Sequence, residues 1–288
     1  MKFTIFYFSG TGNTWWVCRE FAKIVNKSEH DAEFISIEQD DIQSMGYLQK
    51  KLQFTDALGI AYPIYGSTAP QIVWNFMESL EEASQKISID FKENKKKRFG
   101  FILTTMALFS GDGALVLNDE MKKIAFPLLG AINIKMSSNI SIPGFHYDPV
   151  EKEKLEKRKQ KAQKKLKNFF KKLRNDKKKL EGRWNLLGKL GGWIQRKFMD
   201  WALNRTIDWN ANMERCTKCM LCVKECPTDN ITFENEAIRF LDKCTYCMRC
   251  YNFCPTHAIS PREEIADPKK YKRHRGCTEN FKLSILHD

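Results

Sequence analysis

Residues 2–14 read KFTIFYFSGTGNT and indicate the architecture of the first half of the chain. Residues 2–8 are rich in β-branched and aromatic side chains, which is typical of a strand. Small polar residues and glycines follow at 9–14, and a helical pattern begins at once. Its apolar positions are Val17, Phe21, Ile24 and Val25, which recur at the spacing of one helix face.

The same alternation of strand and helix continues to about residue 145. Further apolar runs lie at 33–37, 56–62, 98–104 and 130–136, with helical patterns at 69–83 and 113–126. Strands that alternate with helices in this way are typical of an α/β fold with a doubly wound parallel sheet.

Ligands of such sheets bind beyond the carboxyl ends of the strands, where three loops of this chain are expected. The loop 9–14 offers backbone N–H groups, hydroxyls and a following helix N-terminus, which together can hold a phosphate without lysine. It lacks the Gly-Lys-Ser/Thr ending of a Walker loop. The loop 62–67 offers aromatic faces for a flat ring, and the third loop spans 104–113.

The first loop resembles the phosphate loop of flavodoxins, which has the form S/T-x-T-G-N-T. The matching residues are Ser9, Thr11, Gly12, Asn13 and Thr14. The resemblance implies that they bind the phosphate of FMN and that the other two loops flank its isoalloxazine. The residues expected there are Pro63, Tyr65, Gly66, Thr104 and Gly111, with Tyr65 as the stacking ring. A flavodoxin-like domain that has lost its cofactor is the alternative.

Eight of the ten cysteines form two copies of the spacing C-x2-C-x2-C-x3-C-P, 28 residues apart. The segments CTKCMLCVKECPTDNI (216–231) and CTYCMRCYNFCPTHAI (244–259) agree at 9 of 16 positions, which indicates an internal duplication. This spacing is that of bacterial ferredoxins, which hold two 4Fe-4S clusters. Zinc ligands usually come as C-x2-C pairs, and a disulfide framework suits short secreted chains.

In two-cluster ferredoxins the fourth cysteine of each copy binds the other cluster. The resemblance therefore implies one set of Cys216, Cys219, Cys222 and Cys254 and a second set of Cys244, Cys247, Cys250 and Cys226. Two cysteines lie outside the repeat. Among apolar neighbours, Cys18 is expected to be a buried, inert thiol. Cys277, among basic residues, is expected to lie at the surface, with a reactive thiol as the alternative.

The net charge of +13 comes mainly from one segment. Residues 1–150 have 15 basic and 17 acidic side chains, whereas 151–183 have 16 basic and 5 acidic. This basic segment has a narrow apolar stripe of Leu155, Ala162, Leu166, Phe169, Phe170 and Leu173. The following segment 184–209 contains Trp184, Trp193, Trp201 and Trp209, and a second stripe of Leu187, Leu190, Ile194, Phe198 and Trp201.

Three interpretations of 151–209 remain open: a solvated helix that packs its stripe across the domains, a helix on an anionic membrane surface, and a docking site for an acidic redox partner. Nucleic acid is not expected, because no binding motif accompanies the charge. The sequence begins without a secretory signal, and no apolar run reaches the roughly 18 residues of a membrane span. A cytoplasmic protein of a low-oxygen organism is expected, with peripheral attachment to the membrane as the alternative.

Four parts are expected: a flavodoxin-like FMN domain (1–145), a basic helical insert (146–207), a small α+β ferredoxin-like cluster domain (208–262) and a tail (263–288). The whole resembles the flavodoxin–ferredoxin fusion proteins of anaerobic bacteria. That resemblance implies an electron-transfer protein in which clusters and FMN exchange electrons, with another redox protein as donor or acceptor. Two alternatives are an FMN-dependent reductase of a quinone or other small acceptor, and a redox-sensing interaction protein. No G-x-G-x-x-G motif for a nicotinamide cofactor is present.

Overall fold

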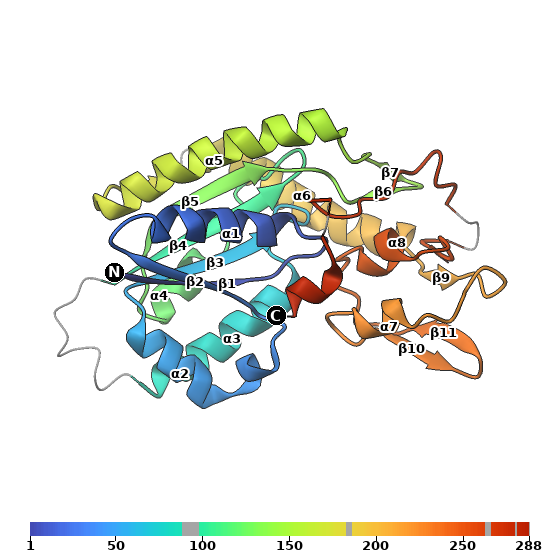
Figure 1. The fold of residues 1–288 in the computed structure, drawn as a ribbon, viewed down its shortest axis with the longest axis horizontal. Helices are drawn as coiled ribbons and strands as arrows, with labels where there is room; N and C mark the ends of the chain where they lie inside the picture. Colours follow the sequence, from blue (N-terminus) through green and yellow to red (C-terminus); the bar gives the residue numbers. More distant parts are fainter. Residues whose placement is uncertain (88–97, 183–185, 263–265, 280, 288) are drawn as a thin grey trace.

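The computed structural model describes residues 1–87, 98–182, 186–262, 266–279 and 281–287 (Figure 1). Its centre is a six-stranded sheet of β1 (Lys2–Tyr7), β2 (Asp31–Ser36), β3 (Ala57–Pro63), β4 (Phe99–Met106), β5 (Leu128–Lys135) and β8 (Lys179–Leu180). The strands are all parallel, in the order β2-β1-β3-β4-β5-β8. The first five have the 2-1-3-4-5 order of the flavodoxin-like fold. The predicted doubly wound sheet is therefore confirmed, and each predicted strand lies within two residues of the observed one.

Helices cover both faces of the sheet (Figure 1). One face carries α1 (Asn13–Asn26) and α5 (Lys152–Arg174), and the other carries α2 (Met45–Phe54), α3 (Gln71–Gln85) and α4 (Asn118–Lys123). The prediction missed α2 and the short 3-10 helix η1 (Asp40–Gln43) before it. It also made α4 too long, because residues 110–117 form turns and the chain adopts a left-handed conformation at Ala125, before Pro127.

The basic helix α5 belongs to the sheet layer. Its apolar stripe packs on α1 and β5: Ala162, Leu166, Phe169, Phe170 and Leu173 are buried, and Leu155 is partly buried against the same core. The next strand, β8, pairs with β5 at the sheet edge. A large part of the segment 146–207 thus completes the α/β layer, and the stripe of α5 packs within this layer rather than across the domains as predicted.

The cysteine repeats lie in a small α+β part beside the carboxyl edge of the sheet (Figure 1). Its helices are α7 (Leu221–Lys224) and α8 (Arg249–Phe253). Its strands form two antiparallel pairs, β10 (Ile231–Glu234) with β11 (Ala237–Phe240), and β9 (Asn210–Ala211) with β12 (Ile259–Ser260).

Three further segments connect the two parts: the hairpin of β6 (Ser141–Ile142) and β7 (Phe145–His146), the helix α6 (Leu186–Thr206), and the C-terminal segment with the 3-10 helix η2 (Leu283–Leu286). The side chain of Leu187 and the whole of Trp184 lie outside the described residues. Across the described helices, none combines the length and apolar character that a membrane span requires.

Candidate functional site

The loop 9–14 joins β1 to α1 and presents unsatisfied polar groups. Gly12 precedes α1 with φ of 93°, a left-handed conformation that favours glycine, and its N–H donates to Ser9 Oγ at 3.1 Å. No side chain caps α1, so its first N–H groups are available to a ligand. The Thr11 hydroxyl and Asn13 Oδ1 are also buried, and neither has a hydrogen-bond partner in the described part of the chain. Buried polar atoms without partners are costly in a protein, so the loop fits an anionic, hydroxyl-bearing ligand.

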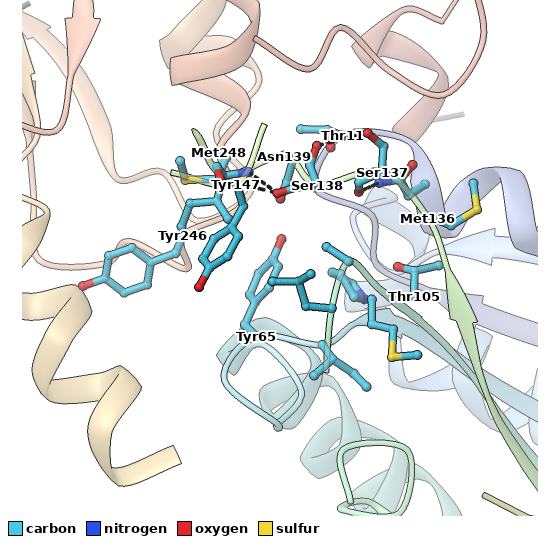
Figure 2. Close-up of a pocket in the computed structure, with 18 of the residues that line it drawn as sticks. Thr11, Tyr65, Thr105, Met136, Ser137, Ser138, Asn139, Tyr147, Tyr246 and Met248 are labelled. Carbon is cyan, nitrogen blue, oxygen red and sulfur yellow. Dashed lines mark hydrogen bonds between the residues drawn. The ribbon is translucent and has the colours of Figure 1, made fainter. Parts of the chain in front are cut away.

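A cavity of about 410 Å³ opens beside this loop (Figure 2). The predicted residues that line it are Ser9, Thr11, Asn13, Thr14, Pro63, Tyr65 and Gly66. Figure 2 shows the Tyr65 hydroxyl directed toward the segment Ser137–Asn139. Burial raises the pKa of Tyr65 well above its usual value, which keeps this hydroxyl neutral.

Three of the predicted flavin-loop residues do not line the cavity. Gly12 contributes the backbone turn, whereas Thr104 and Gly111 were wrongly placed. The Thr104 hydroxyl donates to Asn133 Oδ1 at 2.7 Å inside the core. Gly111 lies against Ser67 and Gly192, where an added Cβ atom would approach Ser67 Oγ to 2.7 Å.

The neighbour of Thr104, Thr105, lines the cavity instead, because successive side chains of a strand point to opposite faces. Its hydroxyl lies 2.9 Å from the hydroxyl of Thr14. Residues 106–109 of the expected third loop also line the cavity. Further lining residues come from segments that were not predicted: Met136–Ile140, Phe145, Tyr147, Gln195, Phe198, Tyr246 and Met248.

The cysteines gather in the two predicted sets. One small cavity is lined by Cys216, Cys219, Cys222 and Cys254, and another by Cys226, Cys244, Cys247 and Cys250. Each set thus combines three cysteines of one repeat with the fourth of the other. Among the described residues, no three His, Cys, Asp or Glu side chains converge on a single metal ion. A cluster with iron at several corners requires thiolates that surround a larger centre.

The backbone around each set repeats with the sequence. Left-handed conformations occur at Lys218, Met220 and Asp229 in the first copy and at Tyr246, Met248 and His257 in the second. Turns of this kind direct successive N–H groups into a concavity that suits an anionic cluster.

The thiols accept matching hydrogen bonds from these turns. Cys216 and Cys244 each accept one from the N–H two residues later, at 3.4 Å. Cys226 and Cys254 accept from the N–H four residues later, at 3.3 and 3.2 Å. Cys244 accepts a further bond from Trp209 Nε1 at 3.3 Å. Hydrogen bonds to ligand sulfurs are one determinant of cluster potential.

The two sets differ in their surroundings. Cys219 of the first set is exposed, whereas Cys247 of the second is 8% exposed and contacts the core of the sheet. The carbonyl oxygen of Cys247 lies over the loop 9–14, where a Cβ atom on Gly10 would be only 2.6 Å away. Asn139 Nδ2 donates to the same oxygen at 3.4 Å. The flanking residues Tyr246 and Met248 line the cavity beside the loop 9–14, so the second set borders that cavity directly.

Arg249 fastens this contact. Its side chain is 1% exposed and donates to Gly10 O at 2.9 Å and Ser9 O at 2.8 Å. Two further N–H groups bind the Glu38 carboxylate at 2.7 and 2.6 Å. Burial alone would lower the pKa of Arg249, but the Glu38 carboxylate raises it above its usual value. The repeat-equivalent residue is Leu221, an apolar side chain that lines the cavity of the first cysteine set.

The C-terminal segment also packs on the loop 9–14, which the sequence analysis did not predict. Cys277, expected at the surface, is 1% exposed, and its thiol donates to Gly12 O at 3.1 Å. Burial raises the pKa of this thiol to about 12. The Phe281 ring packs so closely on Gly12 that a Cβ atom on this residue would lie only 2.6 Å from a ring carbon. Cys18 is fully buried, as predicted.

Residues 208–255 match the family described as 4Fe-4S dicluster domain. The match includes all eight repeat cysteines, so the chain contains a domain for two 4Fe-4S clusters. No curated protein sequence matches the chain.

Solved structures resemble the α/β part. A flavodoxin from the domain Archaea is 15% identical over 60% of this chain and 99% of its own, with a TM-score of 0.39. Megasphaera elsdenii flavodoxin is 21% identical over 48% and 90%, with a TM-score of 0.36. Rubredoxin oxygen:oxidoreductase from Desulfovibrio gigas is 15% identical over 59% of this chain and 37% of its own, with a TM-score of 0.37. These TM-scores are too low to establish a shared fold, so the flavodoxin-like assignment is based on the order of the strands.

Proposed function

We propose that the chain is an electron-transfer protein in which two 4Fe-4S clusters exchange electrons with FMN bound in the cavity beside the loop 9–14. When bound, each cluster passes one electron at a time, and FMN accepts one or two. One electron from each reduced cluster would thus account for the two-electron reduction of one FMN.

The observation that carries this proposal is the direct packing of the second cysteine set on the loop 9–14. The Cys247 carbonyl contacts Gly10, and the residues on either side of Cys247 line the cavity. Arg249 holds these two segments together through its hydrogen bonds to Gly10 O and Ser9 O, and Asn139, from the segment after β5, donates to the Cys247 carbonyl. A cluster and a flavin in these two sites would have no intervening domain or solvent layer between their binding loops.

Residues of the loop 9–14 fit the polar part of FMN. The Thr11 hydroxyl and the first N–H groups of α1 can donate to a phosphate, and Asn13 Oδ1 can accept from a ribityl hydroxyl. Tyr65, Pro63 and Gly66 supply the apolar and aromatic wall for the ring. We therefore assign these residues as the FMN contacts and the eight repeat cysteines as the cluster ligands.

The exposed first set suggests where electrons enter or leave. Cys219 lies at the surface, while the second set faces the cavity. We therefore assign the first cluster to exchange with an external redox protein and the second to exchange with FMN.

The first test is a cofactor assay on protein purified without oxygen. About eight iron atoms with matching sulfide and about one FMN per chain are expected. The clusters are then reduced rapidly, and the flavin absorbance is followed. A flavin that stays oxidised despite a favourable potential difference would refute the exchange, and eight irons with no flavin after addition of FMN would refute the flavin site.

A second candidate function is the reduction of a small apolar acceptor by the bound FMN. It is favoured by the additional lining residues Phe145, Tyr147 and Phe198, which come from the hairpin β6–β7 and from α6 rather than from the three loops. Multiple turnovers of a soluble quinone by chemically reduced protein would support it. If the Phe198→Ala variant reduced the quinone at the wild-type rate, this part of the cavity would not be the acceptor site.

A further inference from the structure

Helix α6 presents an unusual row of exposed apolar side chains. Leu190, Trp193, Ile194, Phe198 and Trp201 are each 52–56% exposed. They recur at steps of three and four residues, so they lie on one side of the helix over about three turns. We call these five residues the α6 stripe.

The stripe continues onto a neighbouring loop. Leu108 and Phe109 are 56% and 49% exposed, and the Phe109 ring lies 3.6 Å from the position of a Cβ atom on Gly191. These two residues and Phe198 also line the rim of the cavity beside the loop 9–14, whereas Leu190, Trp193, Ile194 and Trp201 do not. Exposed apolar patches of this kind are rare on soluble proteins and mark surfaces that contact a membrane or another macromolecule.

The basic helix α5 does not share this property. Its own apolar stripe is buried against α1 and the sheet, so α5 cannot insert apolar side chains into a lipid surface. The structure therefore restricts the membrane interpretation of residues 151–209 to α6 and the loop beside it.

Charged groups around the stripe are predominantly basic. Lys197 and Arg205 are exposed, and the Arg205 guanidinium lies 5.5 Å from the Trp201 ring centre. Arg196 is already paired with Asp112 at 2.6 Å. The sequence of α6 contains four basic residues and one acidic residue. This surface is thus complementary to an anionic partner.

We propose that the α6 stripe rests on the surface of an anionic phospholipid bilayer. Tryptophan, phenylalanine and leucine on one side of a helix, with lysine and arginine beside them, are the composition of interfacial helices. Because the α6 stripe lies along one helix, its surface is convex and can contact a flat bilayer along the length of the helix. The proposal concerns the surface alone and does not depend on cluster or flavin chemistry.

The test is flotation of the full holoprotein with vesicles of phosphatidylcholine alone and of phosphatidylcholine with phosphatidylglycerol in equal parts. Wild-type protein is expected to float with the anionic vesicles and to remain unbound with the neutral ones. The double variant W193A/W201A is expected to bind at least tenfold more weakly, because each tryptophan contributes roughly a factor of ten when its apolar area is removed from water. The double variant K197Q/R205Q is expected to lose much of the difference between the two vesicle types.

A control is F54A, which removes another aromatic side chain, 62% exposed, at the end of α2 and away from the α6 stripe. It should bind like wild type. Absence of flotation with anionic vesicles would overturn the proposal, as would equal loss of binding in F54A and W193A/W201A. A concentration-dependent dimer that W193A/W201A abolishes, without flotation of wild type, would assign the stripe to a second copy of the chain instead.

Discussion

Replacement of Arg249 by leucine, the residue at the equivalent position of the first cysteine repeat, is expected to loosen the contact between the cluster loop and the loop 9–14. The substitution leaves the Glu38 carboxylate, 4% exposed, without its cation. It also removes the donors to Ser9 O and Gly10 O. Breaking a buried pair by removal of one partner costs about 3–5 kcal/mol. For a chain of this size that corresponds to a decrease in melting temperature of roughly 10 °C.

The assay is anaerobic thermal unfolding followed by circular dichroism, with flavin and cluster absorbance recorded in parallel. The exposed Arg239→Leu is the matched control and should change stability by less than about 0.5 kcal/mol. The double variant R249L/E38L removes both charges and should recover most of the loss, since an apolar replacement of a buried pair is often close to neutral. A single R249L variant as stable as R239L, or a double variant with the summed loss of both singles, would refute the assigned role of the ion pair.

Three other outcomes are expected. Thr11→Val should weaken FMN binding about tenfold or more in a fluorescence titration, because a hydrogen bond to the ligand is lost. The control Thr232→Val removes a buried hydroxyl on β10 that also has no partner among the described residues, and it should leave FMN affinity unchanged. Equal FMN affinities of the two variants would exclude Thr11 from the site. Burial lowers the pKa of His274 from 6.5 to about 4, so between these values the unfolded state binds more protons and folding stability should fall as pH decreases, by about 3 kcal/mol in all. Melting temperatures of wild type and His274→Asn should therefore diverge with pH over this range, and parallel curves would contradict the prediction. Trp209→Phe removes the indole donor to Cys244 and should lower the potential of one cluster only in a redox titration followed by electron paramagnetic resonance; a shift of both clusters, or of neither, would argue against this bond as the cause.

Local patterns predicted much of this structure because they report local physical requirements. The strand at 2–8 and the loop after it each depend on residues only a few positions apart in the sequence, and so do the cysteine turns. Helix α2 was missed because it buries only Leu48 and Leu52 and contains Gly46, which leaves a weak periodic signal. The confusion of Thr104 with Thr105 is a one-residue error, and in a strand one residue reverses the face of the sheet.

Local sequence patterns did not predict the contacts between segments that are far apart in the sequence. Nothing around Cys277 or Phe281 in the sequence indicates that they cover the loop 9–14, more than 260 residues earlier. One signal was available for Arg249. The repeats differ at this position, with Leu221 in the first copy. The first copy has its own unmatched charges at Lys218, Lys224 and Glu225, so the difference alone did not distinguish Arg249 from surface residues.

The fixed junction at Gly10 and Cys247 has a kinetic consequence for the proposed electron exchange. Two separate carriers must collide, so their exchange rate depends on the concentration of each and, through charge steering, on salt. Binding loops joined in one folded chain need no encounter, and their effective concentration is set by the fold. Exchange between the two sites should therefore follow first-order kinetics, with a rate that dilution and moderate ionic strength leave unchanged.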